Sequence, residues 1–160
     1  MTHDRAADLT VSVEVRRDAT DVWRAVADPR RVTAWSPEAS AVRGHDIPDG
    51  PMPVGTTFSG SNRHGVFRWA TRCMVVESVA GSSFAFDVRY LGMSVSRWRY
   101  SIHATSDGCR VDEQWWDDRG TPMRWIGTLG TGVADRRTHN LTTMRATLDA
   151  MRDDLERTDT

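Results

Sequence analysis

Apolar and polar residues alternate almost without a break across residues 55–116. A period of two is typical of strands with one buried and one solvated face, because successive side chains of a strand point to opposite sides of the sheet. Turn residues divide this region into expected strands at residues 55–61, 66–79, 83–90, 93–105 and 109–117. Since short turns join these strands, the pattern predicts an antiparallel meander.

Shorter elements precede the meander. Residues 9–17 alternate in the same way and predict a first strand. Asp18 and Asp21 form an acidic helix start, and two short helices are expected before Ser36, because the proline after it disfavours a helical residue there. A weaker strand is expected at residues 39–44, followed by a loop rich in proline and glycine.

The chain closes on one expected amphipathic helix at residues 132–155. Its inward positions recur every three or four residues, at Val133, Arg137, Asn140, Leu141, Met144, Leu148, Met151 and Leu155. Burial of each apolar side chain is worth roughly 1.5 to 3 kcal/mol, which favours docking on a concave sheet face. Between sheet and helix a space for a small molecule is expected. Residues 125–132 are rich in glycine and are expected to form a flexible gate.

Length and composition indicate one domain, at residues 9–156, between a disordered tail at residues 1–8 and a frayed tail at residues 157–160. The 21 basic and 22 acidic residues leave a net charge of −1, so no overall field favours nucleic acid. All of these basic residues are arginine. The absence of lysine excludes Schiff-base chemistry and any phosphate-binding loop that depends on lysine.

Metal and membrane signatures do not emerge from the sequence. The five histidines are scattered, and Cys73 and Cys109 lack metal-ligand spacing, so we expect no metal, no cofactor and two reduced cysteines. No apolar run reaches the length of a membrane span, and the first residues do not resemble a secretory signal. These features predict a cytoplasmic protein, and they leave its oligomeric state open.

Three segments, VSVEVRRDATDVWRAVADPRRVTAWSPE, VGTTFSGSNRHGVFRW and MRATLDAMRDDLE, lie in the predicted order of elements. With them the chain resembles the START-like SRPBCC superfamily and, within it, the polyketide cyclase/dehydrase-like branch. The resemblance implies an α+β helix-grip fold: a curved antiparallel sheet wrapped around a long C-terminal helix, with two short helices after the first strand. It also implies an apolar cavity for lipids, sterols, polyketides or other small hydrophobic compounds. A minority of members are cyclases, aromatases or dehydratases, and none of their catalytic motifs carries over, so enzyme status stays open.

Glu113 is the candidate acid or base. Strand alternation places it on the same face as Val111 and Trp115, so a carboxyl group points toward an apolar interior. Burial would raise its pKa and suit it to proton transfer or to a hydrogen bond with a ligand hydroxyl. The alternatives are a bulge that returns it to solvent, or a structural pair with an arginine such as Arg137.

The remaining candidates are ligand contacts. Arg137 and Asn140 interrupt the apolar stripe of the last helix and could orient a polar ligand group, unless the mouth of the fold is simply solvated. Aromatic residues expected on the inner face could line the cavity or fill the core: Phe58, Trp69, Phe84, Phe86, Trp98, Tyr100 and Trp115. Trp35, Trp116 and Trp125 lie near expected ends or loops, where an exposed aromatic is harder to explain by packing.

Three functions are compatible with this pattern. The first is binding of a small hydrophobic or aromatic, lipid- or polyketide-like molecule, with Glu113, Arg137 and Asn140 as the polar contacts. The second is a cyclase or dehydratase in which Glu113 transfers a proton and Arg137 steadies an oxygen. The third is a protein-interaction module with a filled core, in which Trp125 contacts the partner.

Overall fold

The structure, a computed structural model, describes residues 5–157. Its elements are β1 (Leu9–Val15), α1 (Ala19–Val26), α2 (Pro29–Val32), β2 (Ala39–Arg43), β3 (Thr57–His64), β4 (Phe67–Val79), β5 (Ser83–Tyr90), β6 (Met93–Thr105), β7 (Gly108–Asp117), α3 (Thr121–Thr131) and α4 (Arg136–Arg157). The seven strands form an antiparallel sheet in the order β1-β7-β6-β5-β4-β3-β2. The predicted meander and α+β class are confirmed.

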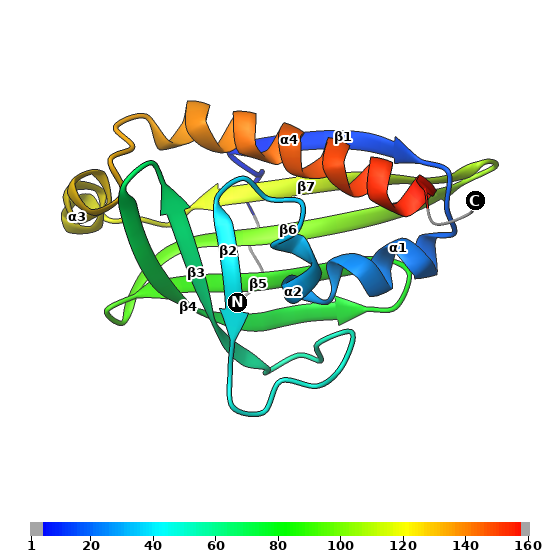
Figure 1. The fold of residues 1–160 in the computed structure, drawn as a ribbon, viewed down its shortest axis with the longest axis horizontal. Coiled ribbons are helices and arrows are strands. Elements are labelled where there is room, and N and C mark those ends of the chain that lie inside the picture. The colour runs from blue at the N-terminus through cyan, green and yellow to red at the C-terminus, as the bar shows by residue number, and fades with distance from the viewer. Residues whose placement is uncertain (1–4, 158–160) are drawn as a thin grey trace.

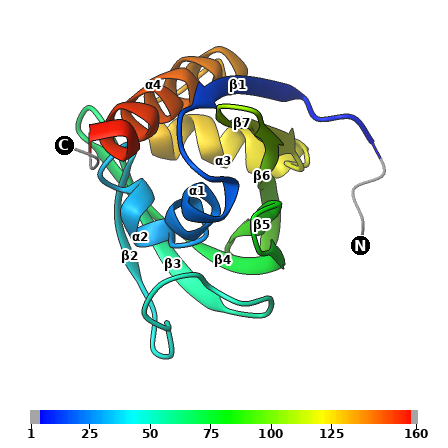
Figure 2. The same ribbon diagram turned by 90° about the vertical axis from the view of Figure 1, so that its right-hand side faces the viewer.

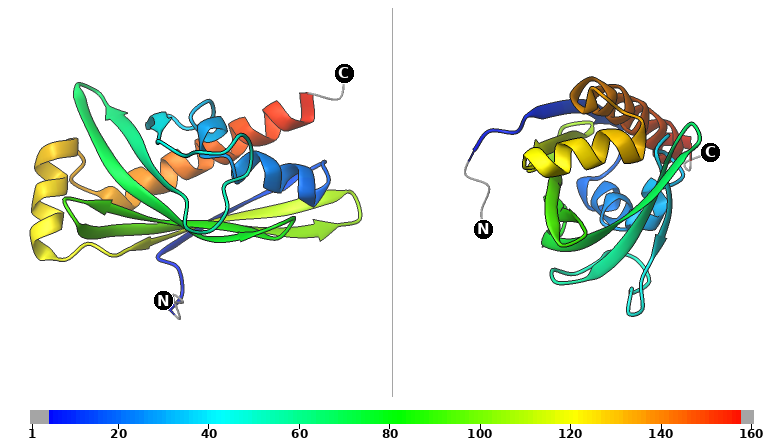
Figure 3. Two further views of the ribbon diagram at one scale, coloured as in Figure 1. Left: turned by 90° about the horizontal axis from the view of Figure 1, so that it is seen from below. Right: turned by 90° about the vertical axis from the view of Figure 1, so that its left-hand side faces the viewer.

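The sheet is strongly curved, and the helices lie on its concave side (Figures 1 and 2). Register shifts occur in the pairings of β2 with β3, β4 with β5 and β5 with β6. Such bulges bend a strand and increase its local twist. The long helix α4 packs along β1, α1 and α2 occupy one end of the concave side, and α3 crosses the opposite end (Figure 3).

The core lies between the sheet and the second half of α4. Leu148, Met151 and Leu155 are buried there, as the spacing of three and four residues predicts, whereas the buried Met144 packs with Leu9 and Trp115. From α1, Val22 and Val26 join the same core. The first half of α4 faces a different environment, because polar residues occupy its inward positions.

The segment before α4 corrects the sequence prediction. Residues 121–131 form helix α3 rather than a flexible gate, and the final helix begins only at Arg136. Pro122 stands in the first turn of α3, where a missing backbone N–H costs nothing, and Gly132 ends the helix with a left-handed φ of 68°. These are ordinary start and stop signals, and they outweigh the low helix propensity of Gly127 and Gly130.

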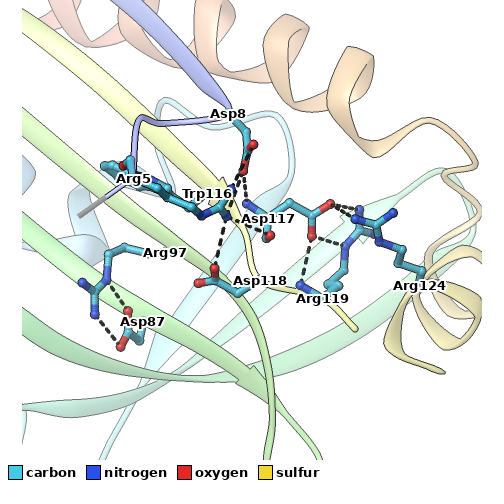
Figure 4. A network of polar contacts seen from close by, with 9 residues as sticks. All are labelled: Arg5, Asp8, Asp87, Arg97, Trp116, Asp117, Asp118, Arg119 and Arg124. Atoms are coloured by element: carbon cyan, nitrogen blue, oxygen red, sulfur yellow. Dashed lines mark hydrogen bonds and ion pairs between the residues drawn. The ribbon is translucent and has the colours of Figure 1, made fainter. Parts of the chain in front are cut away.

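The start of the chain also differs from the prediction. Trp116 Nε1 donates a hydrogen bond of 3.0 Å to the carbonyl of Arg5, and the backbone N–H of Asp117 donates to Asp8 Oδ2 at 2.8 Å (Figure 4). Residues 5–8 are therefore held against the end of β7, and a disordered tail is the wrong description of them. The rest of the predicted tails, residues 1–4 and 158–160, lies outside the described residues. Within residues 5–157, no helix has the length and apolar character needed to cross a bilayer.

Truncation of Leu148 tests the docking of α4. Leu148 is 1% exposed, so Leu148→Ala should destabilise the fold by about 2 to 5 kcal/mol. The matched change Leu129→Ala, in α3, should alter stability by less than about 0.5 kcal/mol, because Leu129 is 77% exposed. Urea denaturation measures both differences, and equal losses in the two variants would contradict the inward orientation of Leu148.

Candidate functional site

A cavity of about 390 Å³ lies between the concave sheet, the first half of α4 and α3. Most of the predicted aromatic residues line it: Phe58, Trp69, Phe86, Trp98, Tyr100 and Trp115. The expectation that Phe84 lines it is wrong. Phe84 is fully buried and belongs to the core that Val22 and Val26 of α1 complete, because α1 covers that end of β5.

Glu113 forms part of the cavity wall and is only 3% exposed. Its strand partner Tyr100 donates a hydrogen bond of 2.9 Å from its hydroxyl to Glu113 Oε1. The second carboxyl oxygen, Oε2, is buried without any hydrogen-bond partner. Glu113 is therefore not returned to solvent by a bulge, and it forms no pair with an arginine of residues 5–157, since Tyr100 is the partner of Oε1 and Oε2 has none.

Burial raises the pKa of Glu113 to about 8, against a small opposing effect of the Tyr100 hydrogen bond. Burial also raises the pKa of Tyr100 well above its ordinary value, and the neighbouring Glu113 adds to this rise. Both groups therefore carry their protons at neutral pH. Glu113 and Tyr100 are therefore both neutral, and Glu113 is a carboxylic acid in an apolar wall rather than an ionised carboxylate paired with a cation.

Of the two polar contacts predicted on α4, Asn140 lies where expected and the arginine is displaced by one residue. Asn140 lines the cavity and is 3% exposed, as expected from the sequence. Arg137 is exposed and does not line the cavity, whereas Arg136 does. The predicted frame ran from Val133 through Arg137, but the helix begins at Arg136, so the spacing of four that leads to Asn140 starts there.

Arg136 is held at the cavity by a cluster that the sequence did not reveal. Its Nη1 donates to both oxygens of Glu38 at 3.0 Å, and its guanidinium lies 5.5 Å from the ring centre of Trp69. The Nε2 atom of His139 lies 2.5 Å from Glu38 Oε2. Glu38 is nearly 100 positions away in the chain, and no local pattern marks it. Its two oxygens are thus already occupied by side chains of α4.

The end of the cavity is covered by α3, whose residues Met123, Ile126, Gly127, Gly130 and Thr131 contribute to the lining. Asp117, at the end of β7, accepts hydrogen bonds of 2.8 Å from Nε and Nη2 of Arg119, and Arg124 of α3 lies nearby (Figure 4). Burial alone would raise the pKa of Asp117, but these arginines lower it overall. The start of α3 is therefore anchored to the sheet by charged groups.

The three tryptophans expected near ends or loops have different environments. Trp35 and Trp116 are buried, and each indole N–H donates a hydrogen bond, to Asp154 Oδ2 and to the Arg5 carbonyl respectively. Trp125 is 71% exposed on α3. The cavity beside it contradicts a completely filled core, the premise of the interaction-module hypothesis. Among residues 5–157, no group of three or more histidine, cysteine, aspartate or glutamate side chains is arranged to hold a metal ion.

This combination of a curved sheet, a long closing helix and a largely apolar cavity between them is that of a helix-grip protein. The profile of the family described as polyketide cyclase/dehydrase and lipid transport matches residues 6–156. The chain therefore belongs to this family, and the resemblance seen in the sequence is confirmed. No functionally curated protein matches the sequence.

Solved structures share the fold. A polyketide-cyclase-like protein of Corynebacterium glutamicum is 25% identical, with a TM-score of 0.60 and coverage of 92% of this chain and 90% of that one. The di-domain ARO/CYC StfQ from the steffimycin biosynthetic pathway is 11% identical, with a TM-score of 0.69 and coverage of 95% of this chain and 51% of that one. The di-domain ARO/CYC BexL from the BE-7585A biosynthetic pathway is 20% identical, with a TM-score of 0.65 and coverage of 91% and 48%. This chain thus spans about half of each di-domain protein.

Glu113→Gln should remove a pH dependence from the stability of the fold. The pKa of Glu113 rises from 4.5 to about 8 on folding, so the native state keeps a proton that the unfolded chain releases between these values. Raising the pH through this interval should cost the unchanged protein on the order of a few kcal/mol relative to the variant. Above about pH 8 the difference should stay constant. Urea denaturation at each pH measures it.

Tyr100→Phe provides a control of opposite direction. The Tyr100 hydroxyl lowers the pKa of Glu113, so its removal should extend the loss of stability to higher pH. A pH profile that is the same for the unchanged protein and Glu113→Gln would contradict a buried, protonated Glu113.

Proposed function

We propose that the cavity binds a small, largely apolar or aromatic molecule, lipid- or polyketide-like, that presents an oxygen acceptor to Glu113. The observation that carries this proposal is the unpartnered Oε2 atom of Glu113 in the cavity wall. A buried polar atom without a hydrogen bond costs about 1 to 3 kcal/mol. A guest that accepts a hydrogen bond there removes this cost, which a purely apolar guest does not.

The hydrogen-bond direction follows from the protonation of the pair. Tyr100 donates to Oε1, so Oε1 is the carbonyl oxygen of the neutral carboxyl group, and the proton belongs on Oε2. Glu113 therefore acts as a donor toward the guest. A ketone, ester or quinone oxygen is the complementary group, and a cation is not.

The rest of the lining favours an apolar body on such a guest. Trp98 and Trp115 lie with ring centres 6.4 Å apart, and Phe58 and Phe86 meet edge to face at 5.7 Å. Aromatic walls of this kind bind flat or hydrophobic groups through burial and offset stacking. A volume of about 390 Å³ lies within the range typical of small-molecule pockets. Asn140 supplies a second polar contact from the opposite wall.

A pair of probes tests the predicted acceptor. Calorimetric titration compares 1-tetralone with tetralin, which has the same bicyclic body without the ketone. Replacing Glu113 with leucine should reduce the ratio of ketone to hydrocarbon affinity by about tenfold, because one net hydrogen bond is lost. Glu113→Gln should keep the ratio, since the amide N–H₂ still donates.

The same titration has a pH dependence. As Glu113 ionises above about pH 8, it becomes an acceptor only, and the ketone preference of the unchanged protein should disappear. An equal ketone preference in the unchanged protein and Glu113→Leu would refute the assigned contact. Failure of both probes to bind at any concentration would argue against this cavity as their site.

A cyclase or dehydratase activity is the second candidate, favoured by the same protonated carboxyl. A pKa of about 8 leaves Glu113 able to donate a proton to a ligand oxygen near neutral pH. Membership of the family supports this candidate. In this activity Glu113 would protonate an oxygen that leaves or becomes a hydroxyl, and Arg136, rather than Arg137, would be the cation that α4 presents to the cavity.

Intramolecular aldol closure of heptane-2,6-dione, with loss of water, tests this activity. The conjugated enone product is followed by its ultraviolet absorbance. Glu113→Gln should lower the turnover number by about 100-fold or more, because the amide cannot supply the proton, while affinity for 1-tetralone stays unchanged. Unaltered turnover in Glu113→Gln would exclude Glu113 as the acid.

A further inference from the structure

A second pocket lies beside the mouth of the cavity. Its lining includes Arg63 and His64 of β3, Arg68 of β4, His139 of α4, and Glu38 from the connection before β2. Glu38 and Arg68 belong to the linings of both pockets. The second pocket therefore adjoins the apolar cavity at Glu38 and Arg68, so that one molecule can reach from one pocket to the other.

The charge of this pocket is positive. Arg63 and Arg68 stand directly opposite each other in the hairpin of β3 and β4, and both are exposed. No carboxylate among residues 5–157 forms an ion pair with either of them, and like charges in such positions destabilise a sheet. The one carboxylate of the pocket, Glu38, is neutralised by Arg136 and lies against His139.

The two arginines are also placed to act together. Arg68 Nη1 donates hydrogen bonds of 2.8 Å to the Gly65 carbonyl and 2.9 Å to the Phe67 carbonyl, which fixes its guanidinium at the hairpin turn. In the same pocket, the rings of His64 and His139 pack edge to face with centres 4.8 Å apart. Guanidinium groups match carboxylate and phosphate oxygens in shape and charge, so an anion is the ligand that would relieve the repulsion.

We propose that this second pocket binds an anionic oxygen group, a carboxylate or a phosphate, carried by the molecule whose apolar part occupies the cavity. The link between the two parts rests on the proposed function, whereas binding of the anion does not. The ligand class becomes an anionic amphiphile with one end at Arg63 and Arg68 and its apolar body toward Glu113.

Titration with inorganic phosphate tests the anion site by itself. Arg63→Gln should weaken binding about tenfold, because one charge-assisted contact is lost, and the double change of Arg63 and Arg68 to glutamine should abolish it. Arg63 makes no side-chain hydrogen bond to a described residue, so its change should spare the fold. Circular dichroism and thermal unfolding verify this for each variant.

The chain offers a matched control. Arg72 and Arg89 are also an exposed, directly opposite arginine pair, on β4 and β5, and they line neither pocket. Their double change to glutamine removes the same charge and should leave phosphate binding unchanged. Equal weakening by the two double changes, or no saturable binding of phosphate to the unchanged protein, would overturn the proposal.

A second titration tests the link to the cavity. Decanoate should bind more tightly than its neutral methyl ester, and Arg63→Gln should remove that preference without weakening the ester. Equal binding of acid and ester to the unchanged protein would overturn the link. Phosphate binding without binding of either amphiphile would refute the cavity function and the link together, and would leave the anion site standing.

Vesicles distinguish the two sources of the anion. Cosedimentation with phosphatidylglycerol vesicles but not with phosphatidylcholine vesicles, lost in Arg63→Gln, would support the site with a lipid headgroup as its ligand. Binding of decanoate without cosedimentation would support it with a free carboxylate.

Discussion

The mismatch between a long curved sheet and a single closing helix determines most of this structure. Leu148, Met151 and Leu155 of α4 pack on the concave face together with α1, and this contact fills only one end. Toward the N-terminus of α4 the inward residues become polar, and the facing strands carry large aromatic side chains. A cavity of about 390 Å³ remains there. Residues of α3, which crosses this end of the sheet (Figure 3), contribute to its lining.

The chemistry of Glu113 is a consequence of that cavity. The pairing of β6 with β7 fixes Glu113 opposite Tyr100, and the alternation of the strand points it inward. Because burial raises its pKa to about 8, the carboxyl group stays neutral at a pH where an exposed glutamate is ionised. A binding protein and an acid catalyst need the same arrangement up to this step. They differ in whether the proton of Oε2 remains on Glu113 or moves to the guest.

Features set by local pattern were predictable from the sequence, and features set by chain junctions or distant contacts were not. The strands and the inward orientation of Glu113 follow from a period of two, which can be recognised within a single short segment. Arg137 was wrongly placed on the inward face because the residue at which α4 begins decides which residues of its first turn point inward. The apolar spacing of three and four residues continues through Gly132 in the sequence, although one helix ends there and the next begins at Arg136. Helix α3 was missed because its glycines resemble a hinge, although Pro122 and Gly132 mark its ends. Glu38 could not be found, since its partners are distant in the chain.

The distribution of unsatisfied polar groups separates structural residues from ligand contacts. At the mouth, Glu38, Arg136 and His139 already satisfy one another, so a guest that contacts them must compete with existing bonds. The buried Nε atom of Arg99 also lacks a partner, but its guanidinium pairs with Glu77 and does not line the cavity. Among residues 5–157, only Glu113 combines an unsatisfied buried side-chain atom with a place in the cavity wall. The free energy gained on binding is therefore concentrated at Glu113. Glu38, Arg136 and His139 serve mainly to hold α4 against the sheet.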